Sequence, residues 1–171
     1  DIQMDDYQII VKFLLQSLLY EMSQKETILD TLVAIAKTEP KCINEKDLQD
    51  YILFKLEAPK VVLQGLRLLK ALSFEDFSSD TLGSILIHIN QILGKSNYFH
   101  PKIIASCLGI ISKIIDMKKL DLKNFFDKTN IIEYAKEVLK MVTNDDKRKT
   151  KIQLFISKIE NTNCASPLPF S

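Results

Sequence analysis

Two segments of the chain carry nearly the same pattern of residues. The first begins at residue 59 and reads PKVVLQGLRLLKAL, and the second begins 42 residues later, at residue 101, and reads PKIIASCLGIISKI. Each segment opens with Pro-Lys, and its aliphatic residues recur at helical spacing. A helical pattern that returns at this period is typical of stacked helical repeats, in which each unit contacts its neighbours. The repeat therefore favours an all-α architecture built from similar units.

The rest of the sequence predicts more helices and no strands. Apolar residues at i, i+3, i+4 and i+7 recur along most of the chain, and alternation of apolar and polar residues never persists. Aligning the last predicted helix, 146–160, on its aliphatic end adds a third copy of the pattern. We expect about four repeat units, at about 5–38, 44–73, 80–117 and 119–160, followed by a flexible tail at 161–171.

Local signals predict where several helices begin and end. Ser23 and Glu26 have the spacing of a capping box, and Asn44 and Asp80 are residue types that cap helix N-termini. Pro59 suits the first turn of the next helix, because its missing N–H group is not needed there. Gly94 is expected at the C′ position after a helix at 81–93.

Composition and cysteine content describe the class of protein. The 171 residues are 46% hydrophobic and 26% charged with a net charge of +1, which fits one globular domain and offers no whole-chain attraction to nucleic acid. The three cysteines lack CxxC spacing, so we expect an intracellular, reducing compartment, either cytoplasm or nucleus. No apolar run is long enough to span a membrane. The chain begins at Asp1, so we expect a piece of a longer protein.

The repeated string resembles the inner helix of HEAT and armadillo repeats: Pro, an aliphatic residue, a small residue and two further aliphatic residues at fixed spacing. The resemblance implies a right-handed α-α superhelix whose inner helices line a concave surface that binds other proteins. The Asn and Trp ladder with which importin-type armadillo proteins bind nuclear localisation peptides is missing, which puts nuclear import in doubt. The matching residues are Pro59, Val61, Gly65, Leu69 and Leu72 in one unit, and Pro101, Ile103, Cys107, Ile111 and Ile114 in the next.

The resemblance also implies a partner-binding surface on the inner helices. Lys60, Lys102 and Lys147 take equivalent positions in three units, and a row of ammonium groups suits an acidic or phosphorylated segment of a partner. The competing interpretation is that these lysines are solvated helix starts. The residues expected to contact the partner are Lys60, Gln64, Arg67, Lys102, Ser106, Lys113, Lys147 and Lys151.

The first predicted helix is apolar on most sides, which indicates burial or association. We expect Leu14 and Leu18 to mediate either stacking of repeats or self-association, so the apolar terminal helix is a second candidate surface for binding a partner.

No motif for catalysis or for a cofactor is present. The chain has no HxxxH, HExxH, GxSxG or phosphate-binding loop, and the small-residue position of the repeat already explains Cys107 without a catalytic histidine. We therefore expect a non-catalytic interaction module of a larger scaffold or adaptor, without metal or organic cofactor.

Two alternative functions stay open. One is a superhelical domain like those of the VHS, ENTH and polymerase-tail-binding families, which would recognise short peptides, often phosphorylated, or lipid headgroups. The other is a HEAT-type array that binds nucleic acid. It would need a strongly basic face, for which the run 147–151 is a candidate, although no aromatic residues interleave there for base stacking.

Overall fold

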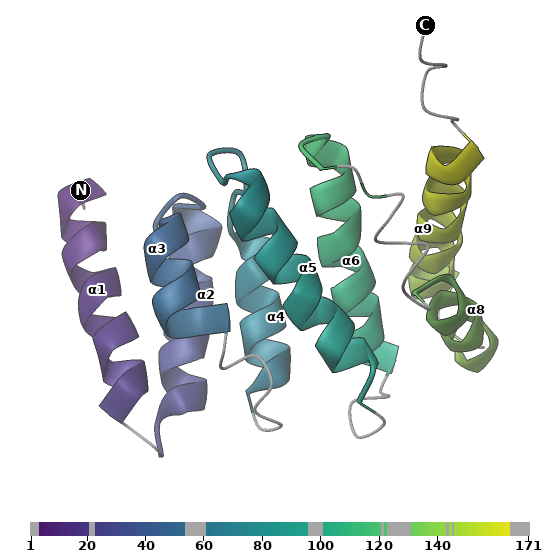
Figure 1. Ribbon diagram of the computed structural model, residues 1–171. Helices are drawn as coiled ribbons and strands as arrows, with labels where there is room; N and C mark the ends of the chain where they lie inside the picture. Colours follow the sequence, from purple (N-terminus) through teal and green to yellow (C-terminus); the bar gives the residue numbers. More distant parts are fainter. Residues whose placement is uncertain are drawn as a thin grey trace, which may run out of the picture. The chain divides into compact units, whose positions relative to one another are not determined.

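The computed structural model is all-helical over the residues that it describes, and its helices pack on one another (Figure 1). The predicted all-α class is thereby confirmed. The chain divides into two compact units, unit 1 at Asp1–Ile92 and unit 2 at Leu93–Ser171. The described residues are 4–20, 23–53, 61–95, 101–120, 122, 131–142, 144 and 146–164.

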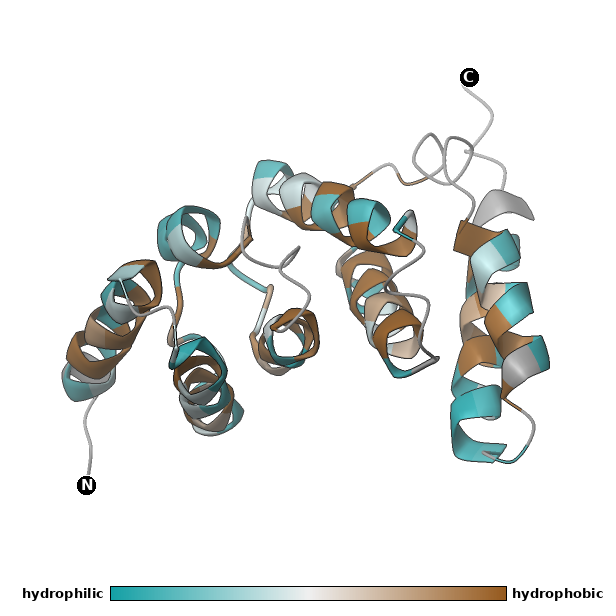
Figure 2. Cartoon of the chain, turned by 90° about the horizontal axis from the view of Figure 1, so that it is seen from below, coloured by the Kyte–Doolittle hydropathy of each residue, from teal (hydrophilic) through white to brown (hydrophobic). Residues whose placement is uncertain are grey.

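Unit 1 is built from two layers of helices. Helix α2 packs along α4, and these two lie side by side in one layer, with the α3–η1 segment and α5 in the other (Figures 1 and 2). Helix α1 packs against both α2 and η1. Helix α5 ends at the boundary between the units. The elements are α1 (Met4–Tyr20), α2 (Lys25–Thr38), α3 (Glu45–Asp47), the π-helix η1 (Leu48–Ile52), α4 (Val62–Ala71) and α5 (Ser79–Leu93).

Leucine side chains fill the interior of unit 1. Leu15, Leu32 and Leu66, from α1, α2 and α4, are fully buried, and each belongs to an apolar stripe at helical spacing. The connector before α5 is anchored by Phe74 and Phe77, whose rings stack with centroids 5.5 Å apart. The aromatic residues of this acidic connector are thus core residues.

Unit 2 is a cluster of three helices, α6 (Pro101–Met117), α8 (Ile131–Met141) and α9 (Asp146–Cys164), in which each helix packs against the other two. Helix α9 continues to Cys164, so the predicted end near Glu160 is four residues too early. The residues that fill the centre of the cluster are aliphatic or small and fully buried: Cys107, Ile110, Ile111, Ala135, Val138 and Ile159.

The structure confirms one predicted cap and corrects two. The Asn44 Oδ1 atom accepts a hydrogen bond from the Asp47 N–H group at 2.8 Å, as expected of an N-cap. Helix α2, in contrast, begins after Gln24 without a side-chain cap, so the capping box at Ser23 is wrong. At α5 the cap is Ser78, whose Oγ accepts from the Thr81 N–H group at 3.3 Å. Asp80 lies inside the first turn, where its charge is favourable.

The third predicted helix differs from a single α-helix. Its first turn, α3, passes into the π-helix η1, and the predicted continuation to residue 57 lies outside the described residues. Pro59 and Lys60 also lie outside them, and α4 begins at Val62.

The residue after α6 adopts a left-handed backbone conformation. Lys118 has φ 55°, and its N–H group donates to the Ile115 carbonyl oxygen at 3.1 Å. The predicted C′ glycine, Gly94, does not have a positive φ. A side chain at a left-handed position is strained by contact between its Cβ and the following carbonyl oxygen.

We expect Lys118→Gly to raise the free energy of unfolding of unit 2 by about 0.5–1 kcal/mol, because glycine removes this strain. Urea unfolding measures the change. Lys119→Gly is the matched control: it removes the same charge one residue later, where φ is not positive, and should give no gain. Equal changes in the two variants would contradict the strain at Lys118.

Candidate functional site

Two helices of unit 2 carry lysine at both ends of one shared helical spacing. On α6 the pattern is Lys102, Ser106, Gly109 and Lys113, and on α9, 45 residues later (102 to 147), it is Lys147, Lys151, Leu154 and Lys158. Both sets have the spacing i, i+4, i+7, i+11, which places their members along one side of a helix. We call Lys102, Lys113, Lys147, Lys151, Leu154 and Lys158 the basic face of unit 2.

An ion pair and a hydrogen bond join the two helices at this face. The Lys158 Nζ atom lies 2.5 Å from the Asp116 Oδ1 atom and donates to the Ser112 Oγ atom at 3.0 Å. Lys158 belongs to α9, and Ser112 and Asp116 belong to α6, which packs against α9. Lys158 of the α9 pattern therefore lies against α6, where it contacts two residues outside the α6 pattern.

The cations of the basic face differ in their surroundings. Lys102, Lys147 and Lys151 are exposed, whereas Lys113 is half-buried, and burial lowers its pKa. Leu154 is 65% exposed in the same row of α9. The face thus combines several ammonium groups with one apolar contact point.

The lysines of α9 lie where a helix favours negative charge. Lys147 and Lys151 are in the first two turns, near the positive end of the helix macrodipole, and Asp146 is the acidic residue of the first turn. Each cation there opposes the dipole. Residues that break a local rule without structural gain are typical of functional sites.

The corresponding side of unit 1 carries less charge in its described part. On α4, Arg67 is exposed and Gln64 is half-buried, with its Oε1 atom buried and without a hydrogen-bond partner. The predicted row from Lys60 to Lys147 stays a prediction, because Lys60 lies outside the described residues.

The structure places one predicted contact residue in the interior of unit 2 and shows three further residues on or beside the basic face. Ser106 is only 9% exposed, because its position on α6 turns toward the interior of unit 2, so it is not available to a partner. Leu154, Lys158 and Asp116 were not predicted. The sequence did carry a signal for the first two, since Leu154 and Lys158 repeat Gly109 and Lys113 at the 45-residue spacing.

Helix α1 has two apolar faces. Val11, Leu15 and Leu18 point into unit 1, and Leu18 is 1% exposed. On the opposite side Ile9, Phe13 and Tyr20 are 69%, 68% and 81% exposed. Leu14 is half-buried and Leu18 is a core residue, so of the two predicted roles, stacking of repeats or self-association, Leu18 is not available for self-association.

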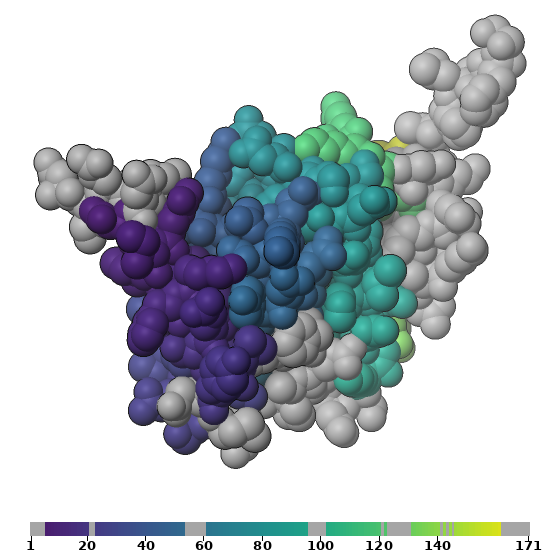
Figure 3. Space-filling model, turned by 60° about the vertical axis from the view of Figure 1, so that its left-hand side comes forward, coloured from purple at the N-terminus to yellow at the C-terminus, as the bar shows by residue number. Residues whose placement is uncertain are grey.

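The exposed side of α1 forms a continuous row at the spacing i, i+4, i+7, i+11. We call Ile9, Phe13, Gln16 and Tyr20 the outer stripe of α1. Hydrophobic residues occupy much of the side of α1 that is seen in Figure 2, and the helix lies at the surface of unit 1 in Figure 3.

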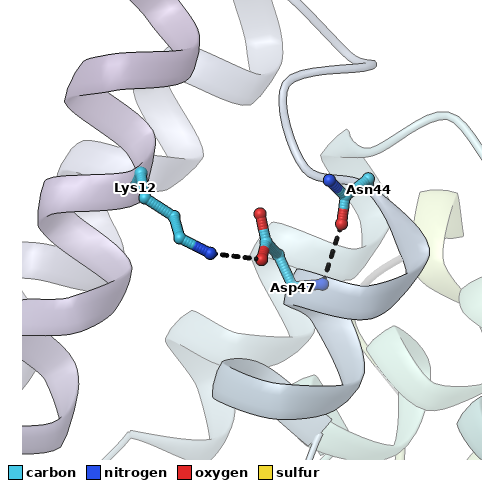
Figure 4. A network of polar contacts seen from close by, with 3 residues as sticks. All are labelled: Lys12, Asn44 and Asp47. Carbon is cyan, nitrogen blue, oxygen red and sulfur yellow. Dashed lines mark hydrogen bonds and ion pairs between the residues drawn. The ribbon is translucent and has the colours of Figure 1, made fainter.

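A polar contact fixes α1 to the neighbouring segment. The Lys12 Nζ atom lies 2.9 Å from the Asp47 Oδ1 atom and 5.1 Å from the centroid of the Tyr51 ring. The hydrogen bond to Asp47 raises the pKa of Lys12. Asp47 in turn is held by Asn44, so the three residues form one network between α1 and α3 (Figure 4).

The two cysteines with described side chains are unsuited to nucleophilic chemistry. Cys42 and Cys107 are buried, and burial raises the pKa of the Cys42 thiol to about 11 and that of the Cys107 thiol to about 12. Both are therefore protonated at neutral pH, whereas the thiolate is the nucleophile.

Neither a metal cluster nor a membrane span is found in the described part of the chain. No group of three or more His, Cys, Asp or Glu side chains there could hold a metal ion, and none of these helices is long and apolar enough to cross a membrane. His100 lies outside the described residues.

Comparison of the chain with protein-family models, with curated proteins and with solved structures found no match. Functional inference therefore rests on the two surfaces, the basic face of unit 2 and the outer stripe of α1.

Proposed function

We propose that the chain is a non-catalytic protein-interaction module of the HEAT/armadillo type, a right-handed superhelix of short repeats, and that it binds an acidic segment of another protein on the basic face of unit 2. One observation carries the proposal: the packed helices α6 and α9 each carry lysine at both ends of the same helical spacing, and Lys158 of α9 contacts Asp116 and Ser112 of α6. Equivalent positions of successive units then form one binding surface, as in repeat proteins generally.

The chemistry of the face specifies the partner. Packed helix axes lie about 8–10 Å apart, so lysines of α6 and α9 can reach carboxylates or phosphates along one extended segment. Leu154 fits an apolar side chain between those acidic groups. Because an exposed ion pair contributes only about 0–1 kcal/mol, affinity requires several acidic residues and decreases with salt.

Nucleic acid is the second candidate, favoured by the basic residues at the start of α9. The exposed Leu154 fits a phosphate backbone less well than a peptide that carries apolar side chains. The basic face also has no aromatic residue on which a base could stack. A superhelical domain of the VHS or ENTH kind would share the peptide chemistry and differ in helix order.

The proposal is tested with a fluorescent peptide of mixed Glu and Leu residues, its Gln-for-Glu counterpart and a single-stranded oligonucleotide. We expect the acidic peptide to bind best, and the double variant Lys147→Glu, Lys151→Glu to weaken its binding roughly tenfold or more. Fluorescence anisotropy at two salt concentrations measures both effects. Tighter binding of the oligonucleotide than of the acidic peptide would favour the nucleic-acid function.

The matched control is Lys136→Glu with Lys140→Glu on α8 of the same unit, where two exposed lysines have the same spacing. It changes the net charge equally and should leave peptide binding within about twofold. The α9 variant should also be more stable, by about 0.3–1 kcal/mol, because an acidic residue at position 147 suits the first turn of a helix. Equal losses of binding in the two variants would mean that net charge alone, rather than the basic face, attracts the peptide.

A further inference from the structure

We propose that the outer stripe of α1 is a self-association surface, on which α1 of a second copy of this chain packs antiparallel about a two-fold axis. The first observation is the exposure of Ile9, Phe13 and Tyr20, which is unusual for large apolar residues at consecutive helical positions. The row is one helix wide, so another helix is the element that covers it.

The exposed area fits a reversible dimer. An aromatic side chain buries about 150–250 Å² when fully covered, so Phe13 and Tyr20 together offer roughly 300 Å². With Ile9 and the half-exposed Ile10 and Leu19, the helix offers about 500 Å², or about 1,000 Å² for two copies, which is near the lower limit of a specific interface. The area therefore indicates a dimer that dissociates on dilution.

The spacing of the stripe matches a two-fold axis. Its intervals are four, three and four residues, which read the same in both directions around a midpoint between Leu14 and Leu15. An isologous contact uses the same patch on both copies, and this spacing, which every helical stripe at i, i+4, i+7 and i+11 shares, is compatible with one. An axis at this midpoint places Ile9 opposite Tyr20 of the second copy.

The residues nearest the midpoint are also self-compatible. Phe13 and Gln16 are the central members of the stripe and lie toward different sides of it. The axis therefore brings the two Phe13 rings together on one side and the two Gln16 amides on the other. An amide both donates and accepts hydrogen bonds, so two glutamines can satisfy each other across the axis.

Sedimentation velocity over a hundredfold range of protein concentration tests the association. We expect a concentration-dependent dimer for the unaltered chain and a monomer for Phe13→Glu, with unchanged helical circular dichroism. Ile87→Glu is the matched control, because Ile87 is 57% exposed on α5 outside the stripe, and it should dimerise normally. A chain that stays monomeric over the whole range, or a Phe13→Glu variant that still dimerises, would overturn the proposal.

Mixing two charged variants tests the geometry. Because position 13 meets its own equivalent near the axis, Phe13→Glu and Phe13→Lys should each be monomeric alone and form a heterodimer when mixed. A mixture that stays monomeric although the unaltered chain dimerises would contradict the antiparallel arrangement. Binding of the acidic peptide is measured in parallel and should be unaffected by Phe13→Glu, so failure of one proposal is distinguishable from failure of the other.

Discussion

Replacing Leu18 with Asp is expected to unfold unit 1 or to destabilise it by more than about 4 kcal/mol. Leu18 is fully buried on the inward face of α1, so the variant would place a carboxylate in an apolar interior without a partner. Truncation of a buried leucine itself costs about 2–5 kcal/mol, and this cost adds to the desolvation penalty. Circular dichroism during urea unfolding measures the change.

The matched control lies on the same helix. Ile9→Asp introduces the same charge on the opposite face, in a helix half where acidic residues are favourable, and should change the free energy of unfolding by less than about 0.5 kcal/mol in dilute protein. A stable, folded Leu18→Asp variant would show that the inward face of α1 has been assigned incorrectly.

The second large effect is alkaline destabilisation through the buried thiols. Their pKa values in the folded chain are about 11 for Cys42 and about 12 for Cys107, compared with 9.0 for an unperturbed thiol. The folded state thus holds its protons longer than the unfolded state, so stability is full below pH 9.0 and decreases as pH rises toward 11–12. A shift of one in pKa corresponds to about 1.4 kcal/mol. The free energy of unfolding of unit 1, through Cys42, and of unit 2, through Cys107, should therefore each decrease by about 2–3 kcal/mol by pH 11.

Lysines and tyrosines titrate in the same range, so the comparison must isolate the thiols. Cys42→Ala reports on unit 1 and Cys107→Ala reports on unit 2, and each should reduce the slope of unfolding free energy against pH between 9 and 11. The slope is compared rather than the absolute stability, because each substitution also removes packing. Identical slopes with and without the thiols would contradict the raised pKa values.

The sequence predicted what depends on spacing along one helix. The equivalence of Lys102 with Lys147 follows from the repeat period. Asn44 was predicted as a cap because the interaction is local, between residues three apart.

What the sequence could not predict depends on neighbours distant in the chain. The burial of Ser106 is decided by which side of α6 the other helices of unit 2 cover. The sequence did not determine whether the row with Leu18 or the row with Phe13 faces the interior of unit 1, because α1 is apolar on both sides. The π-helix at Leu48–Ile52 has no counterpart in the pattern of apolar residues, and nothing in its sequence explains it.

The contacts of Lys12 help to decide which of the two apolar sides of α1 faces the interior of unit 1. With apolar rows on opposite sides, α1 would gain similar hydrophobic energy in two orientations related by half a turn about its own axis. Lys12 breaks this degeneracy, because only one orientation brings its ammonium group to Asp47 and to the Tyr51 ring. A surface ion pair of small energetic value thus favours one rotation of α1 about its own axis. That rotation decides which apolar row stays in solvent.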